Sequence, residues 1–129
     1  MTARSRPGFI ILSTLLLTAL AATALAKPAS KWRIECDHKS DNAGEIILRI
    51  APEGGQPIDV TTRIPEKTGE NHAAHILRDS LRASLGEGYK VEVDDGEDVL
   101  IKRKGKTPKF EVTLVSSSVA GLSVGIKKE

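Results

Sequence analysis

The sequence predicts an α+β fold, a mostly antiparallel sheet of about six to seven strands with one amphipathic helix packed on one face. One stretch, residues 70–85, places its apolar side chains at the 3.6-residue period of a helix. Several other stretches alternate with the period of two that is typical of half-buried strands. Because no second helical stretch is available for parallel crossovers, antiparallel pairing is expected. The predicted order is β-β-β-α-β-β-β-β.

The first 26 residues predict a secretory signal peptide that is cleaved before Lys27. Arg4 and Arg6 supply a positive start, Phe9 to Ala26 contain no charge, and Ala24-Leu25-Ala26 has the small-x-small pattern of a cleavage site. An uncleaved membrane anchor is the alternative, since an apolar run of this length approaches what a bilayer requires. Its richness in Ala and Thr and its cleavage pattern favour removal. We therefore expect a periplasmic or secreted protein with no stable membrane insertion after cleavage.

Residues 27–129 predict a single small domain, because a chain of this length can build one modest core. The full sequence has 19 Lys and Arg against 17 Asp and Glu, and loss of Arg4 and Arg6 makes the exported chain formally neutral. A neutral chain has no general attraction for nucleic acid, so none is expected as a partner. Cys36 is the only cysteine, which excludes an internal disulfide and leaves a buried thiol or an intermolecular disulfide.

Three strands are expected before the helix. Residues 31–37 alternate apolar and charged positions, residues 45–51 do the same, and residues 58–64 resume the pattern after a loop containing two prolines and a Gly-Gly pair. The second and third strands are expected to form a hairpin. The helix over 70–85 is expected to begin at an N-cap on Thr68 or Gly69 and to stop at Gly86.

Four strands are expected after the helix. Residues 89–94 alternate, and Asp95-Gly96 is a preferred two-residue hairpin turn, with the return strand at 99–101. Two further strands are expected over 110–115 and 122–126. If these last two pair with each other, the terminal Lys127 and Lys128 return toward the start of the strand at Phe110.

The helix offers one candidate metal site. His72, His75 and Asp79 fall within about 60° of one another on its polar face, so two imidazoles and a carboxylate could meet one transition-metal ion such as zinc. No other cofactor is indicated. The competing interpretation is a set of solvent-exposed polar side chains, because structural and catalytic zinc sites usually take ligands from more than one element.

A basic segment follows the return strand of the hairpin. Local positive charge in an exported protein suits an anionic envelope polymer, lipid headgroups or an acidic protein surface. Ordinary solvation of a strand end is the alternative. The candidate polyanion-binding residues are Lys102, Arg103, Lys104, Lys106 and Lys109.

Catalytic patterns in the sequence are incomplete. Gly121-Leu122-Ser123-Val124-Gly125 spells a nucleophile elbow, but that mechanism needs a following helix and a downstream His, and only four residues remain. Cys36 and His38 lie on one face of a strand, nearly 7 Å apart, which is long for proton transfer. Five carboxylates between Glu92 and Asp98 surround a turn too short for a calcium loop.

These observations favour an exported, non-catalytic binding domain whose partner is an unidentified protein or an envelope polyanion. A weak transition-metal module that uses the helix histidines is the first alternative. A hydrolase that uses Ser123, Cys36 or His38 is the second, and a concave pocket at any of these side chains would favour it. The pattern of residues does not identify the partner or the oligomeric state.

Overall fold

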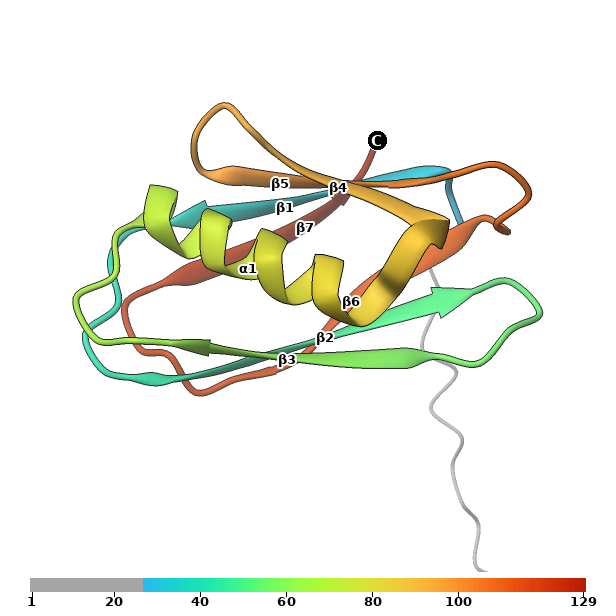
Figure 1. Cartoon of the computed structure of the whole chain (residues 1–129). Coiled ribbons are helices and arrows are strands. Elements are labelled where there is room, and N and C mark those ends of the chain that lie inside the picture. Colours follow the sequence, from blue (N-terminus) through green and yellow to red (C-terminus); the bar gives the residue numbers. More distant parts are fainter. Residues whose placement is uncertain (1–26) are drawn as a thin grey trace, which may run out of the picture.

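The computed structural model describes residues 27–129, so the proposed signal peptide lies outside the described residues. It confirms the α+β class and the order of seven strands and one helix (Figure 1). The elements are β1 (Lys31–Asp37), β2 (Gly44–Pro52), β3 (Ile58–Ile64), α1 (Glu70–Leu85), a short 3₁₀ turn (Gly86–Gly88), β4 (Tyr89–Asp94), β5 (Asp98–Arg103), β6 (Phe110–Ser117) and β7 (Ser123–Lys128).

The strands divide between two sheets, with orders β4-β5-β1-β7 and β3-β2-β6, and every neighbouring pair is antiparallel. β2 and β3 form the expected hairpin. The last two strands do not pair with each other: β6 pairs with β2, whereas β7 pairs with β1. A shift in register between β2 and β6 at Ile47/Leu48 accompanies this divergence. The chain therefore crosses from one sheet to the other after Ser117.

Helix α1 lies along the open side between the two sheets (Figure 1). It contacts β3 at one sheet edge and β4 at the other. The predicted apolar stripe is its buried face, and the helix ends at Gly86, whose φ of 66° suits glycine. The N-cap is Gly69. The Thr68 hydroxyl does not cap the helix and donates to the Pro65 carbonyl. The buried residues of α1 are Ala73, Ala74, Leu77, Leu81 and Leu85.

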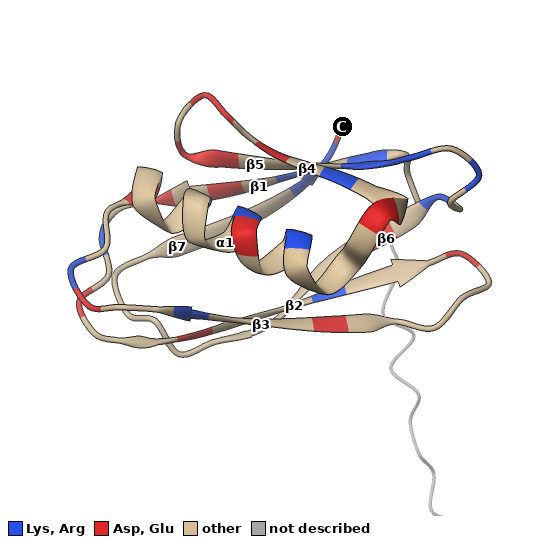
Figure 2. Cartoon of the chain, in the orientation of Figure 1, with Lys and Arg blue, Asp and Glu red and all other residues tan. Residues whose placement is uncertain are grey.

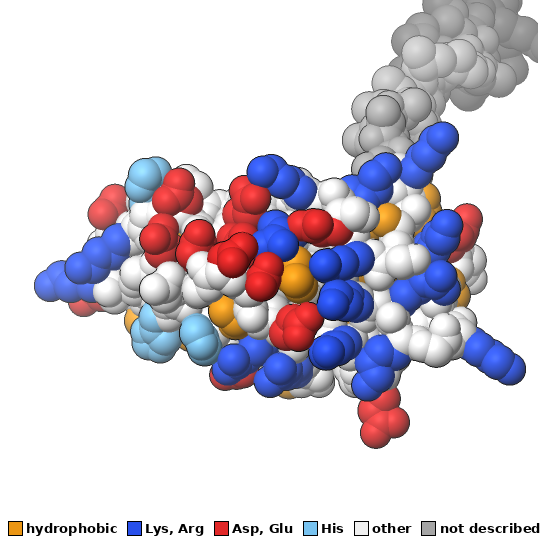
Figure 3. Space-filling model, turned by 90° about the horizontal axis from the view of Figure 1, so that it is seen from above, with side chains coloured by type: hydrophobic (Ala, Val, Ile, Leu, Met, Phe, Trp, Pro, Cys, Tyr) orange, Lys and Arg blue, Asp and Glu red, His pale blue; other side chains and the backbone are white. Residues whose placement is uncertain are grey.

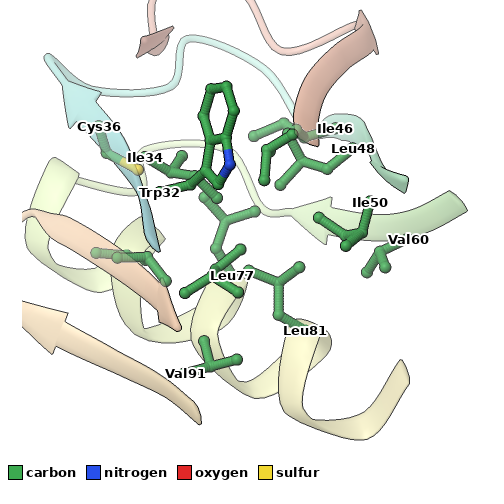
Figure 4. Packing of buried hydrophobic residues seen from close by; sticks show 14 of the residues in the cluster. Trp32, Ile34, Cys36, Ile46, Leu48, Ile50, Val60, Leu77, Leu81 and Val91 are labelled. Atoms are coloured by element: carbon green, nitrogen blue, oxygen red, sulfur yellow. The ribbon is translucent and has the colours of Figure 1, made fainter. Parts of the chain in front are cut away.

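The core is mainly aliphatic and lies between the two sheets and the helix (Figure 4). Trp32 of β1 reaches across it, and its indole N–H donates to the Phe110 carbonyl of the other sheet at 2.7 Å. Phe110 also meets Tyr89 edge-on, with ring centroids 5.1 Å apart. Cys36 is buried as a free thiol at the end of the same strand face. All three aromatic side chains of the described domain are thus used in packing.

The β4–β5 hairpin has a three-residue loop, Asp95 to Glu97, rather than the expected two-residue turn. Asp95 and Gly96 both have positive φ, as that turn chemistry predicts. The extra residue, Glu97, turns its carbonyl to accept the Cys36 N–H at 3.1 Å. The loop is therefore fastened to β1 as well as to its own strands.

No helix within residues 27–129 is long and apolar enough to cross a membrane.

Candidate functional site

The outward face of the four-stranded sheet is graded in charge from one end to the other (Figure 2). Because Trp32 and Ile34 point into the core, the odd-numbered residues of β1 point outward. The strand registers place Lys31 beside Lys102, and Lys102 beside Lys90. Three lysines from β1, β5 and β4 therefore form one row across the sheet, which we call the lysine row.

Like charges side by side on neighbouring strands destabilise a sheet, since strands lie about 4.8 Å apart. Glu92 is the carboxylate that offsets this repulsion, with oxygens 3.2 Å from Lys102 Nζ and 3.7 Å from Lys90 Nζ. Its pKa is lowered by the hydrogen bond from Lys102 and then by the charge of Lys90. Lys31 makes no ion pair among residues 27–129; after Arg33, its charge is a lesser cause of the lowered pKa of Glu129. The row therefore keeps an excess of positive charge.

The predicted basic segment joins this row. Lys102 is its inner member, and Lys104, Lys106 and Lys109 are exposed on the loop between β5 and β6. Arg103 differs from its neighbours, because its guanidinium donates to the Ser30 hydroxyl at 2.9 Å and to the Thr107 carbonyl at 3.1 Å. Arg103 therefore shapes the loop, and the lysines are the groups available to an anion.

We call the end of the molecule that carries these lysines the basic end. Seen from above, Lys and Arg gather over one half of this face and Asp and Glu over much of the other (Figure 3). Lys128 of β7 lies opposite Trp32 and so reaches the same end, although by pairing with β1 rather than with β6. The basic end comprises Lys31, Lys90, Lys102, Lys104, Lys106, Lys109 and Lys128.

The middle of the same face is neutralised within itself. Arg33 donates to Asp98 at 2.6 Å and to Asp94 at 2.9 Å, and it also pairs with Glu129. These bonds raise the pKa of Arg33, with Glu129 as the largest cause and Asp98 as the next. Lys127 pairs with Glu35 at 3.0 Å. The two cations in the middle of this face, Arg33 and Lys127, are thus already paired with carboxylates.

Two pockets lie at the opposite, acidic end. The larger, about 670 Å³, is lined by residues 37–39 and by Gly69 and Glu70 at the start of α1. The smaller pocket, about 310 Å³, lies between the end of β1, the start of α1 and the β4–β5 loop, and Cys36 is among its lining residues. A pocket at His38 or Cys36 would favour the hydrolase alternative. Whether it does depends on whether these two side chains can act as nucleophile and base.

The thiol at this end is a poor nucleophile. Burial, and then the charges of Asp98, Glu70 and Glu97, raise the pKa of Cys36 to about 12. Since the thiolate is the reactive form, almost none is present near neutral pH. His38 is largely exposed and lies 3.6 Å from the Asp37 carboxylate. The pocket walls therefore repel the charge that nucleophilic catalysis needs.

Ser123 does not lie on a nucleophile elbow. It is the first residue of β7, exposed and opposite Asp37 on β1, and a strand rather than a helix follows it. The sharp strand-to-helix turn that presents a catalytic serine is therefore missing at this position.

The candidate metal residues His72, His75 and Asp79 are all exposed on α1. Asp79 accepts a hydrogen bond from Arg78 at 2.9 Å, which lowers its pKa, and His75 Nδ1 lies 2.7 Å from the Asn71 carbonyl oxygen. Within the part of the chain that the structure describes, no three His, Cys, Asp or Glu side chains are close enough together to hold a metal ion. The metal module stays a prediction.

Sequence reasoning missed Lys31 and Lys90 as members of the site. They lie far from Lys102 along the chain, and only the β4-β5-β1 order brings them beside it. The available signal was alternation, which places each lysine on an outward face but does not give the strand order. Comparisons with protein-family models, curated proteins and solved structures found no match for this chain.

Proposed function

We propose that the protein is an exported, non-catalytic domain that binds an anionic partner of the envelope, a polyanion or an acidic protein surface, through its basic end. The lysine row is the observation that carries this proposal. Three side chains from three strands are held side by side at a cost in repulsion, and one shared carboxylate offsets only part of it. An anion bound across the row would relieve that repulsion.

The proposal does not depend on net charge. The exported chain is formally neutral, but Arg33 and Lys127 in the middle of the sheet face are paired with carboxylates, whereas seven lysines gather at the basic end with Glu92 as the carboxylate between two of them. Charges separated by more than about 8 Å are largely screened at physiological ionic strength. The basic end can therefore attract an anion although carboxylates crowd the opposite end.

The aromatic side chains favour a partner other than nucleic acid. Single-stranded nucleic acid is commonly held by bases stacked on exposed aromatic rings. Trp32, Tyr89 and Phe110 are all buried, with relative exposures of 3%, 9% and 0%. The surface offers charge without a stacking platform.

The test is retention on a heparin column, with heparin as a generic polyanion. We expect the exported protein to bind at low salt and to elute as salt rises, because point charges near a surface are screened. The variant Lys31→Gln/Lys90→Gln/Lys102→Gln should elute much earlier at an unchanged melting temperature.

A matched control removes the same charge elsewhere. Lys39, Lys67 and Arg63 are exposed, and none belongs to the basic end. The variant Lys39→Gln/Arg63→Gln/Lys67→Gln should elute close to the unmodified protein. Passage of the unmodified protein through the column at low salt would refute the proposal.

A further inference from the structure

We infer that the partner of the basic end is an anionic lipid surface, on which the domain lies with its acidic end pointing away. This inference rests on the proposed function and names the partner more closely. Three features carry it: the spread of the lysines, the polarity of the sheet face, and the place where the chain enters the domain.

The lysines cover an area rather than lining a groove. The lysine row crosses three strands, a width of about 10 Å at the usual strand spacing. Lys104, Lys106 and Lys109 extend it beyond the strand ends on an exposed loop. The two pockets described above lie at the other end of the molecule. An exposed array of flexible ammonium groups fits a plane of phosphates, where each lysine near the surface contributes about 1 kcal/mol.

The charge gradient along the sheet also fits a plane. The carboxylates near the β4–β5 loop, including Asp95 and Glu97, lie at the far end of the face from the lysine row. A negatively charged surface attracts one end and repels the other, so it orients the domain. A short soluble anion would gain nothing from that distant acidic end.

The chain enters the domain at the basic end. Ala29 and Phe110 exchange two backbone hydrogen bonds of 2.9 and 3.0 Å, and Ser30 accepts the Arg103 N–H at 3.0 Å. The segment before Lys27, with its uncharged run from Phe9 to Ala26, is therefore joined beside the lysine loop. If that run is kept as an anchor, the basic end is the part of the domain to which it is joined.

The test is co-sedimentation of the exported protein with vesicles of phosphatidylcholine containing about one third phosphatidylglycerol, with pure phosphatidylcholine vesicles as the neutral reference. We expect binding to the anionic vesicles alone, and its loss at roughly 0.5 M salt, where the screening length falls to a few ångströms. The lysine-row variant should lower the partition coefficient at least tenfold. A loop variant, Lys104→Gln/Lys106→Gln/Lys109→Gln, guards against a folding defect in the first and should also bind more weakly.

The outcomes separate this inference from the function on which it rests. Retention on heparin without preference for anionic vesicles would overturn the lipid surface and leave a soluble polyanion as partner. Equal weakening by the Lys39→Gln/Arg63→Gln/Lys67→Gln control would overturn the basic end as the docking surface. Passage of the unmodified protein through the heparin column at low salt would overturn the proposed function and, with it, this inference.

Discussion

At the scale of single residues, a few polar side chains hold loops together by hydrogen bonds that the alternation of apolar and polar residues does not predict. Ser40 is almost fully buried; its hydroxyl accepts the Thr68 N–H at 2.7 Å and donates to the Pro65 carbonyl at 2.7 Å. It ties the loop after β1 to the segment before α1. The sequence marks these positions only as loop residues, because their role depends on two loops that meet in space.

Cys36 gives a residue-scale prediction about pH. Its pKa is raised from 9.0 to about 12 in the folded protein, first by burial and then by nearby carboxylates. Above pH 9 the unfolded chain loses the thiol proton while the folded chain keeps it, so this group lowers stability as pH rises from about 9 to 12. Denaturant unfolding at several pH values should show a steeper fall in stability for the unmodified protein than for Cys36→Ala.

The same buried thiol should resist iodoacetamide in the native protein at pH 8 and react after unfolding. Rapid native alkylation, or identical pH profiles for the two proteins, would mean that the thiol is exposed and that the pocket at Cys36 is open to chemistry.

At the scale of elements, α1 closes the open side between the two sheets by packing against β3 of one and β4 of the other. Leu77 is fully buried in its apolar stripe, so Leu77→Ala should cost about 2 to 5 kcal/mol of unfolding free energy. Arg82 has a smaller role, because its guanidinium donates to the Val91 carbonyl of β4 at 2.8 Å from an exposed position. Arg82→Ala should cost about 1 kcal/mol.

Denaturant melts of these two variants compare the two sides of the helix. Equal losses of unfolding free energy would mean that the polar side of the helix contributes as much as its apolar stripe, contrary to the packing described above. Leu81→Ala, on the same stripe one turn later, should behave like Leu77→Ala.

At the scale of the whole molecule, the sequence predicts the elements well and their assembly less well. Period and turn chemistry found seven strands, the helix and the left-handed Gly86 because these signals are local. The division into two sheets, and the pairing of β7 with β1, depend on which strands meet through the core. Local alternation carries no information on that choice.

In the candidate site too, the local part could be predicted from the sequence and the part that depends on strand order could not. The predicted loop lysines lie together because they are neighbours in sequence, but Lys31 and Lys90 join them only through strand order. Arg103 has the predicted charge, but its guanidinium is bound within the loop. The basic end is thus a property of the assembled sheet.

An amide chemical-shift titration of residues 27–129 with a short soluble polyanion, such as a heparin oligosaccharide, tests most directly whether the basic end is the binding surface. We expect salt-sensitive shifts at Lys31, Lys90 and Lys102 and along the loop from Lys104 to Lys109. Shifts centred on the exposed face of α1, or on the pockets around His38 and Cys36, would contradict this expectation.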